Sequence, residues 1–450
     1  MTAAPAAPAP GGAAARRPCG VAPRVLRLEE LLADPRDASN RYGFHALAGA
    51  GEQGIRERAG ELLGAVGAEF VPAEQGGHFV AADLLVRALR PLLGRDAALG
   101  HACTATALLA AAGGGAPGPV PAFELAPLLV PASLTAAAGT ALRAAVHAVA
   151  EREAHEPALG RWRPPLAAAF ADLLACESLT TVALRSLRLP PDSGRALRAA
   201  AGHAVPAVIG DVLDEARLAL AECGYGAGDT EVRLCAKVQD DVPYVLGRTD
   251  AAAVCQAGLI RELPFLADGF GPGTEAAARA LFRLEDPPDA DGPGDAGDPG
   301  RFGPAGCEAA LRGVLAATAA RAGEHAGAGS AGGLARTARR LLTEQRLLST
   351  PSRAAAFAED PAAARALADR HALLLLACAV LGIRDGAAGG GGRFLARPSW
   401  ALLALSRITQ RLGVVPAVAV HDPHADVAAE MDARRRQGIA YDLHSTRTPW

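Results

Sequence analysis

The sequence is notable first for what it has little of. Lys237 is its only lysine, Asn40 its only asparagine, and aromatic residues make up 4% of its 450 positions. Alanine, leucine and arginine are abundant instead, which favours helices that pack closely through small side chains. We attribute this bias to GC-rich codon usage, so alanine runs alone carry no functional argument. No internal repeat and no useful run of alternating apolar and polar residues is present, and we predict an all-α fold.

Charge and cysteine spacing exclude several classes of partner. A formal net charge of -3 gives no general attraction to nucleic acid or to an anionic membrane. The eight cysteines are scattered and form no C-x-x-C pair, which argues against a zinc ribbon or a disulfide framework and fits a reducing compartment. The sequence His421-Asp422-Pro423-His424 is typical of a helix cap and turn. We therefore expect no metal site and no nucleic-acid partner.

No segment has the pattern of a secretory leader or of a membrane span. The first twenty residues lack an uninterrupted apolar run after a basic start. The most apolar run, residues 371–383, falls short of the ~20 residues that a spanning helix needs, so we interpret it as a buried helix. We expect a cytoplasmic protein that has no membrane partner.

Helical spacing and composition divide the chain into six parts. An acidic Pro/Gly stretch at 284–306 cannot bury enough apolar surface to order itself and marks a boundary. The predicted parts are a disordered tail (1–24), an N-terminal helical domain (25–112), a short joint (113–126), a helical bundle (127–283), the disordered linker (284–306) and a helical extension (307–450). The predicted helices are 25–34, 52–68, 79–94, 97–112, 134–153, 165–189, 193–222, 250–267, 307–323, 333–348, 360–382, 398–412 and 424–437.

A motif in the first helical domain carries a family resemblance. Residues 70–77 read FVPAEQGG, and a helix and then Arg95-Asp96 follow. Considered alone, these residues would form a plain helix–helix turn. Together they resemble the P-x-E-x-G-G … R-D signature of the N-terminal domain of acyl-CoA dehydrogenases. The resemblance implies that His101 lines a pocket for the acyl substrate.

A second and longer match lies in the bundle. Residues 134–156 resemble the family helix that ends in E-R-x-x-F-G, with Glu151 and Arg152 kept and Glu156 in place of the final glycine. In the family this arginine helps hold the flavin nucleotide of a neighbouring subunit, since a guanidinium pairs with a diphosphate through two hydrogen bonds. The resemblance thus makes Arg152 a candidate cofactor ligand. The carboxylate of Glu156 opposes that role electrostatically.

Two further stretches extend the match. Residues 219–226 (ALAECGYG) resemble the family's x-x-x-H-G-G-x-G-Y turn, and the resemblance assigns Gly224 and Tyr225 to cofactor binding. Residues 237–252 resemble the loop that holds the catalytic carboxylate in many members, and the base position falls at Thr249. A threonine hydroxyl has too high a pKa to act as a base unaided. The adjacent Asp250 takes the role if the alignment shifts by one residue, so both stay catalytic candidates.

About half of the chain resembles the acyl-CoA dehydrogenase and acyl-CoA oxidase-like superfamily without its central β domain. Residues 111–126 are all that joins the two helical matches, whereas a small barrel needs on the order of 70 residues. The resemblance implies N- and C-terminal helical domains joined directly, followed by the helical extension seen in oxidase-like members. FAD would then be lost or shared with a partner.

Three functional hypotheses remain open at this point. The chain is a degenerate or repurposed member that recognises an acyl thioester or a partner subunit without autonomous flavin chemistry. Alternatively, it is an FAD-dependent dehydrogenase or oxidase subunit whose flavin site is completed by a partner chain, or it has a new cofactor-free activity in the old cleft. The resemblance implies an acyl-CoA or acyl-carrier-protein thioester as ligand. It also implies a homo-oligomer, or a hetero-oligomer with an acyl-CoA dehydrogenase-like chain.

Overall fold

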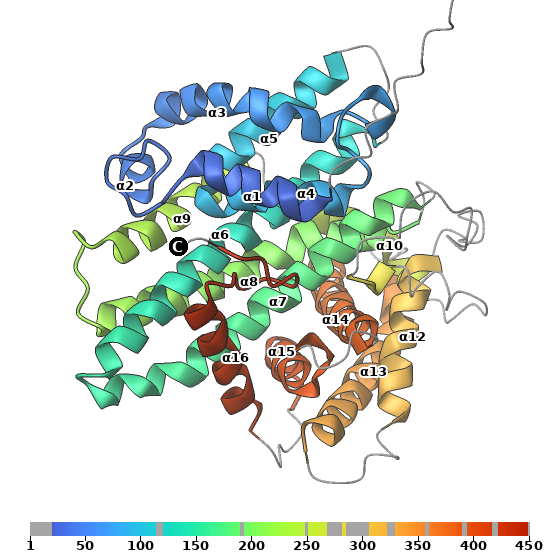
Figure 1. Cartoon of the computed structure of the whole chain (residues 1–450). Coiled ribbons are helices and arrows are strands. Elements are labelled where there is room, and N and C mark those ends of the chain that lie inside the picture. Colours follow the sequence, from blue (N-terminus) through green and yellow to red (C-terminus); the bar gives the residue numbers. More distant parts are fainter. Residues whose placement is uncertain are drawn as a thin grey trace, which may run out of the picture.

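The computed structural model describes residues 20–113, 120–189, 193–247, 251–267, 281–284, 306–321, 329–355, 360–388, 394–415 and 422–448. Within these ranges the chain forms helices and no β-strand (Figure 1). Two isolated β-bridges, Pro72–Phe79 and Ile439–Arg447, are the extended pairings that the described residues make. The prediction of an all-α fold is confirmed.

The first five helices form one layer of the molecule, drawn in blue at the top of Figure 1. They are α1 (Val21–Leu32), α2 (Phe44–Ala48), α3 (Glu52–Val66), α4 (Ala82–Arg95) and α5 (Ala97–Gly113). In this layer α1 packs on α4, and α3 packs on α5. The layer is joined to the rest because α4 and α5 both pack on α6.

A bundle of four helices lies beneath this layer. It consists of α6 (Ala122–Glu153), α7 (Arg163–Arg185), α8 (Arg195–Glu222) and α9 (Thr230–Leu246). Helix α6 begins twelve residues before its predicted start, because Pro127 and Pro131 lie inside the helix rather than ending it. Residues 237–246 were expected to belong to a loop and instead form the second half of α9.

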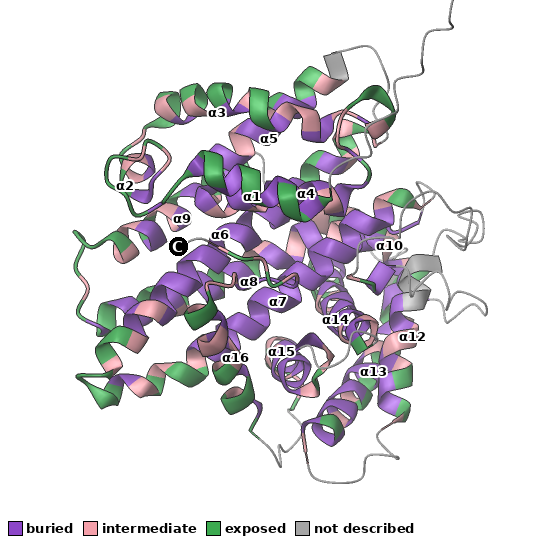
Figure 2. Cartoon of the chain, viewed as in Figure 1, coloured by how far each residue is buried: buried purple, intermediate pink, exposed green. Residues whose placement is uncertain are grey.

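Six more helices among the described residues form a third group, which packs on the bundle through α10, α14, α15 and α16 (Figure 1). They are α10 (Ala251–Ala267), α12 (Gly306–Ala320), α13 (Ser330–Ala355), α14 (Pro361–Ala387), α15 (Pro398–Arg411) and α16 (Pro423–Gln437). Helices α14, α15 and α16 all contact α7, whereas α10 contacts α8. The buried apolar residues form one core that is connected in space, with members from Leu28 to Leu443 in the sequence. Figure 2 shows buried residues in all three groups of helices.

The expectation of a cytoplasmic protein with no membrane partner is contradicted by four of these helices. The segments Ala122–Glu153, Pro157–Arg188, Arg195–Glu222 and Pro361–Ala387 are each long and apolar enough to cross a membrane. The expectation was wrong because it rested on the longest unbroken apolar run, whereas small residues such as alanine keep a whole helix apolar. The apolar windows of these segments are 61% to 100% buried within the chain itself.

A buried ion-pair group fastens the first layer to the bundle. The Nζ atom of Lys237 on α9 lies 2.9 Å from Asp96, at the start of α5, and also pairs with Asp241. The two carboxylates are 1% and 7% exposed. Burial alone would lower the pKa of Lys237, but the two carboxylates outweigh it and raise that pKa. The only lysine of the sequence is therefore shared by two buried carboxyl groups, and burial and repulsion by Asp96 raise the pKa of Asp241 to about 6.

Replacing this lysine should destabilise the protein strongly. We expect Lys237→Met to lower the free energy of unfolding by about 3–5 kcal/mol, because it leaves two buried carboxylates without a counter-charge. Urea denaturation measures the change. As a control, Arg56→Ala removes the exposed Arg56–Glu52 pair and should cost about 0.5 kcal/mol or less. Equal losses in the two variants would contradict the structural role of Lys237.

Candidate functional site

The two catalytic candidates of the sequence, Thr249 and Asp250, lie outside the described residues. The described residues on either side of them are Gly247, which directly follows α9, and Ala251, where α10 begins. The assignment of either residue as the catalytic base therefore stays a prediction.

The three cofactor candidates do come together. Arg152 lies in the last turn of α6, and its guanidinium carbon is 5.3 Å from the centre of the Tyr225 ring. Gly224 precedes this tyrosine with a φ of 72°, a left-handed conformation that favours glycine. The tyrosine hydroxyl donates a 3.4 Å hydrogen bond to Oε2 of Glu151. The turn after α8 is thus fastened to the end of α6.

The surroundings of Arg152 are rich in carboxylates. Glu151 and Glu231 act electrostatically on Tyr225, while Glu156 and Glu222 act on the neighbouring Cys223. Glu222 pairs with Arg161, and Glu231 lies 3.7 Å from Arg36. Glu151 and Glu156 add negative charge near the stacked guanidinium, which opposes the binding of a diphosphate there.

His101 occupies a different place, between α5 and α9. Its ring packs edge-on against Tyr244 on α9, with 5.9 Å between ring centres. Burial lowers the pKa of His101, so the imidazole stays neutral at physiological pH. Its Nδ1 atom is buried and has no hydrogen-bond partner. His101 is therefore separated from the Arg152–Tyr225 contact, and the described residues do not unite the two in one site.

The motif residues of the first layer have structural reasons of their own. A side chain at Gly77 would place its Cβ atom 2.1 Å from the carbonyl oxygen of Val71, so only glycine fits this tight turn. The side chain of Arg95 donates hydrogen bonds to the carbonyl oxygens of Leu32, Ala33 and Tyr42, at 2.9–3.0 Å. The P-x-E-x-G-G and R-D residues thus shape and fasten the layer of α1 to α5.

Asp422 and His424 belong to a helix cap. The side chain of Asp422 accepts a 2.9 Å hydrogen bond from the backbone N–H of His424 at the start of α16. Its Oδ1 atom also lies 2.6 Å from Nδ1 of His424. His421 lies outside the described residues. This geometry confirms the interpretation of these residues as a cap and turn.

A serine–histidine contact that sequence spacing could not reveal lies between α13 and α14. The hydroxyl of Ser352 is 2.8 Å from Nε2 of His371. Burial lowers the pKa of His371 to about 4. Ser352 is 0% exposed, so no substrate can reach its hydroxyl in this conformation. The pair satisfies buried polar groups rather than forming a nucleophilic site.

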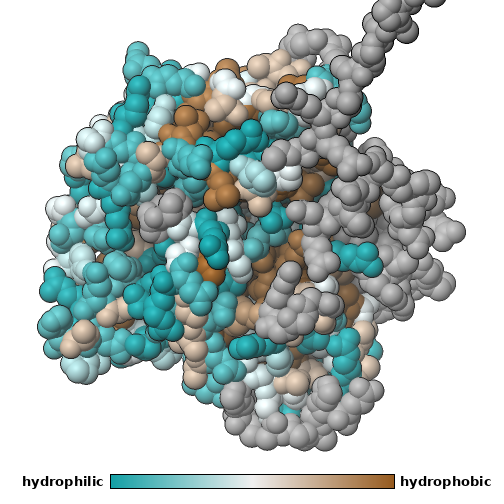
Figure 3. Space-filling view, in the orientation of Figure 1, coloured by the Kyte–Doolittle hydropathy of each residue, from teal (hydrophilic) through white to brown (hydrophobic). Residues whose placement is uncertain are grey.

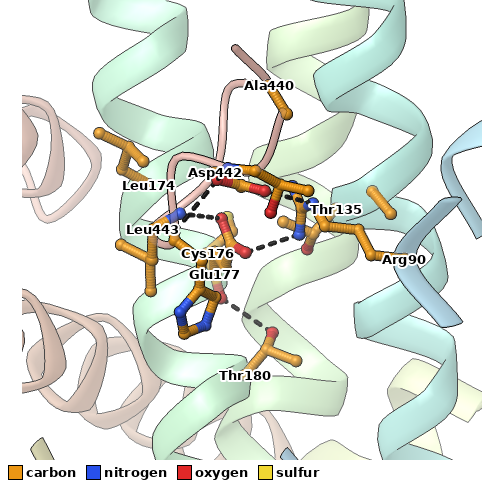
Figure 4. A network of polar contacts seen from close by, with 12 residues as sticks. Arg90, Thr135, Leu174, Cys176, Glu177, Thr180, Ala440, Asp442 and Leu443 are labelled. Carbon is orange, nitrogen blue, oxygen red and sulfur yellow. Dashed lines mark hydrogen bonds and ion pairs between the residues drawn. The ribbon is translucent and has the colours of Figure 1, made fainter. Parts of the chain in front are cut away.

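A further buried polar cluster was not foreseen from the sequence. It forms where residues 438–448, which we call the strap, fold back from α16 onto the middle of the bundle (Figure 4). Arg90 on α4 donates a 2.6 Å hydrogen bond to Glu177 on α7, and its Nε atom lies 3.1 Å from Asp442 of the strap. The backbone N–H of Leu443 donates to the other oxygen of Glu177 at 3.1 Å. One guanidinium therefore serves two buried carboxyl groups.

The strap is held along most of its length. The Tyr441 ring lies 4.9 Å from that of Phe170, and its hydroxyl donates to the carbonyl oxygen of Met431. Oδ1 of Asp442 accepts hydrogen bonds from the backbone N–H groups of His444 and Thr446, at 3.1 and 3.0 Å. These contacts satisfy the polar groups that the strap buries.

Glu177 and Asp442 share Arg90, and their pKa values shift in opposite directions. Burial raises the pKa of Glu177 to about 7, and the attraction of Arg90 does not offset it because Asp442 adds repulsion. Burial would also raise the pKa of Asp442, but Arg90, His444 and the hydrogen bonds from Thr446 together outweigh it, and that pKa is lowered. Burial and repulsion by Arg87 lower the pKa of His444 to about 3. At neutral pH, Asp442 is ionised, His444 is neutral and Glu177 is partly protonated.

His444 lies between two cavities. A small internal cavity of about 20 Å³, which is room for one water molecule, is bordered by Glu177, Arg87 and His444. A larger cleft of about 580 Å³ lies on the other side of the strap residues Leu443, His444 and Ser445. Figure 3 shows apolar surface near the centre of the face in view. His444 lines both cavities, whereas Glu177 borders the small one.

One sequence signal could have pointed to this cluster. Asp172 and Glu177 are carboxylates within the otherwise uncharged and largely apolar stretch of residues 166–184, and a carboxylate in such a stretch needs a buried partner. Both have one, since Asp172 pairs with Arg407 and Arg411 of α15. Glu177, in contrast, is paired with Arg90 and with the backbone N–H of Leu443, which lies 266 positions away in the sequence.

Comparisons with known proteins identify no relative, since no family model, no curated protein and no solved structure matches the chain. Support for a function therefore comes from the contacts, burial and charges of the chain itself.

The titration of Glu177 should appear in the pH dependence of stability. A raised pKa in the folded state means that the stability due to Glu177 is full below its unfolded pKa of 4.5 and is lost as pH rises through about 7. We expect the free energy of unfolding of the wild type, relative to Glu177→Gln, to fall by on the order of 2–3 kcal/mol between about pH 5 and pH 8.

Urea denaturation of both proteins across this pH range tests the expectation. His444 contributes the opposite trend, because its lowered pKa costs stability as pH falls below 6.5, but it is present in both proteins and cancels in the difference. A difference that stays constant, or that grows with pH, would show that Glu177 is ionised throughout.

Proposed function

We propose that this chain is an acyl-CoA dehydrogenase-like helical protein that recognises an acyl thioester or a partner subunit and performs no flavin chemistry on its own. The observation that carries the proposal is the short connection between α5, which ends at Gly113, and α6, which begins at Ala122. A β domain that covers a flavin would need on the order of 70 residues at this place. The connection has room for a turn.

The surface around Arg152 supports the same conclusion. In the family the corresponding arginine meets a diphosphate, whereas here its guanidinium stacks on Tyr225 near the carboxylates of Glu151 and Glu156. Those carboxylates would have to be neutralised or moved before a nucleotide could bind. The retained residues Arg152, Gly224 and Tyr225 instead fasten the turn after α8 to the end of α6.

One observation favours the alternative in which a partner chain completes a flavin site. Arg152 is exposed at the end of α6, where another subunit could reach it. A partner with its own β domain would cover the ring of the flavin, and added basic groups would offset the carboxylates. This alternative requires a stable complex with a second acyl-CoA dehydrogenase-like chain.

We expect the isolated chain to purify without colour. Bound flavin absorbs visible light, and a flavin without a covering β domain would be open to water on one side. The measurement is the visible absorption spectrum, followed by extraction of the heat-denatured protein to recover any released FAD. Stoichiometric FAD from the isolated chain would contradict the proposal.

A matched measurement separates the two alternatives. The chain is mixed with FAD, desalted, and examined again, alone and after co-purification with any chain that it captures. Flavin retained only in the complex, and lost from it in the variant Arg152→Ala, would favour the shared site. Acyl-CoA binding by the colourless chain, measured by calorimetry, would support recognition without flavin.

A further inference from the structure

Helices α5 and α6 form a hairpin that carries almost no charge. Between Asp96 and Arg143 the sequence has a single charged residue, Glu124, although 21% of the whole sequence is Asp, Glu, Lys or Arg. The two helices pack on each other, and the connection from Gly113 to Ala122 is short. The hairpin therefore has few groups whose transfer out of water is costly.

The connected end of this hairpin exposes apolar side chains to water. Leu109, near the end of α5, is 75% exposed, and Phe123, in the first turn of α6, is 77% exposed. Ala126 and Pro127 are exposed as well. Figure 1 shows the end of α5 and the start of α6 on the same side of the molecule. We call these four residues the hairpin tip.

Behind the tip, both arms of the hairpin are apolar. Helix α6 is long and apolar enough to cross a membrane, and the apolar part of α5, Ala97–Ala111, is shorter. In the folded chain the apolar window of α6 is 89% buried, and α4 and α9 pack on both arms. The tip is thus the place where this apolar hairpin reaches the surface.

The tip is too small for a stable interface with another protein. Such an interface buries about 800 Å² on each partner and has a polar rim. One large aromatic side chain supplies about 150–250 Å², so Phe123 and Leu109 together fall well short of that area. Glu124 is the one charged residue near the tip, which leaves little for charge complementarity. A lipid surface needs neither a large area nor a polar rim, because single apolar side chains enter the boundary between headgroups and acyl chains.

We propose that the hairpin tip inserts into the surface of a lipid bilayer, with Leu109 and Phe123 among the acyl chains and the rest of the fold in water. No Lys or Arg lies between Asp96 and Arg143, so burial of apolar area drives the insertion rather than attraction to anionic headgroups. The apolar arms stay in the core of the fold. The proposal does not depend on the family resemblance.

Flotation of the full chain with phosphatidylcholine vesicles tests this proposal. We expect the wild type to float with the vesicles at millimolar lipid. Phe123→Ser should lower the partition coefficient by about tenfold, the loss expected when one large apolar side chain no longer enters the bilayer. Leu109→Ser should lower it in the same direction. Both side chains are exposed, so the melting temperature of either variant should equal that of the wild type.

A matched variant controls for exposed apolar side chains in general. Leu347 on α13 is 67% exposed and lies outside the hairpin, so Leu347→Ser should change the partition coefficient by less than about twofold. Adding phosphatidylglycerol to the vesicles should change it by less than about threefold.

Three results would overturn the proposal. The first is no flotation of the wild type at millimolar lipid, or flotation only with phosphatidylglycerol. The second is an equal loss of binding in Phe123→Ser and Leu347→Ser. The third is a wild-type dimer, measured by light scattering without lipid, that dissociates in Phe123→Ser, because it would assign the tip to a second copy of the chain.

Discussion

The sharing of Arg90 between Glu177 and Asp442 is the contact on which the centre of this molecule depends. It joins α4, α7 and the strap at one point, with all three side chains at most 13% exposed. Because buried charges are stable only when paired, the strap has one favourable position, in which its carboxylate and its backbone N–H meet the two ends of this network. Leu443, His444 and Ser445 are thereby placed between the internal cavity and the larger cleft.

Helices could be predicted from the sequence because each buries a periodic apolar face, and most bounds agree within a few residues. The departures have physical causes. Pro127 and Pro131 are accommodated inside α6, since packing against α4, α5, α7, α8, α9 and α16 compensates for the lost backbone hydrogen bonds. Residues 237–246 were expected in a loop because of the family resemblance, yet Leu234, Val238 and Val245 form the buried side of α9.

The candidate site was harder to predict than the fold. The Arg152, Gly224 and Tyr225 group was foreseen because motif residues retain their spacing, although the surrounding carboxylates give it a different character. The strap cluster could not be foreseen, because it pairs a side chain of α7 with a backbone group 266 positions away. Apolar character was also misjudged, since small residues rather than bulky runs make four helices long and apolar enough for a membrane.

Hydrogen exchange of the strap amides tests most directly whether the strap is docked on the bundle. The sharing of Arg90 between Glu177 and Asp442 and the shape of the larger cleft both require a docked strap. The N–H groups of Leu443, His444 and Thr446 donate to carboxylates, and that of Thr448 donates to the carbonyl oxygen of Gly438. We expect the Leu443 amide, which is hydrogen-bonded to buried Glu177, to exchange only through large-scale opening, with protection close to that of the α7 amides. Rapid exchange of residues 442–446 in the otherwise folded protein would contradict it.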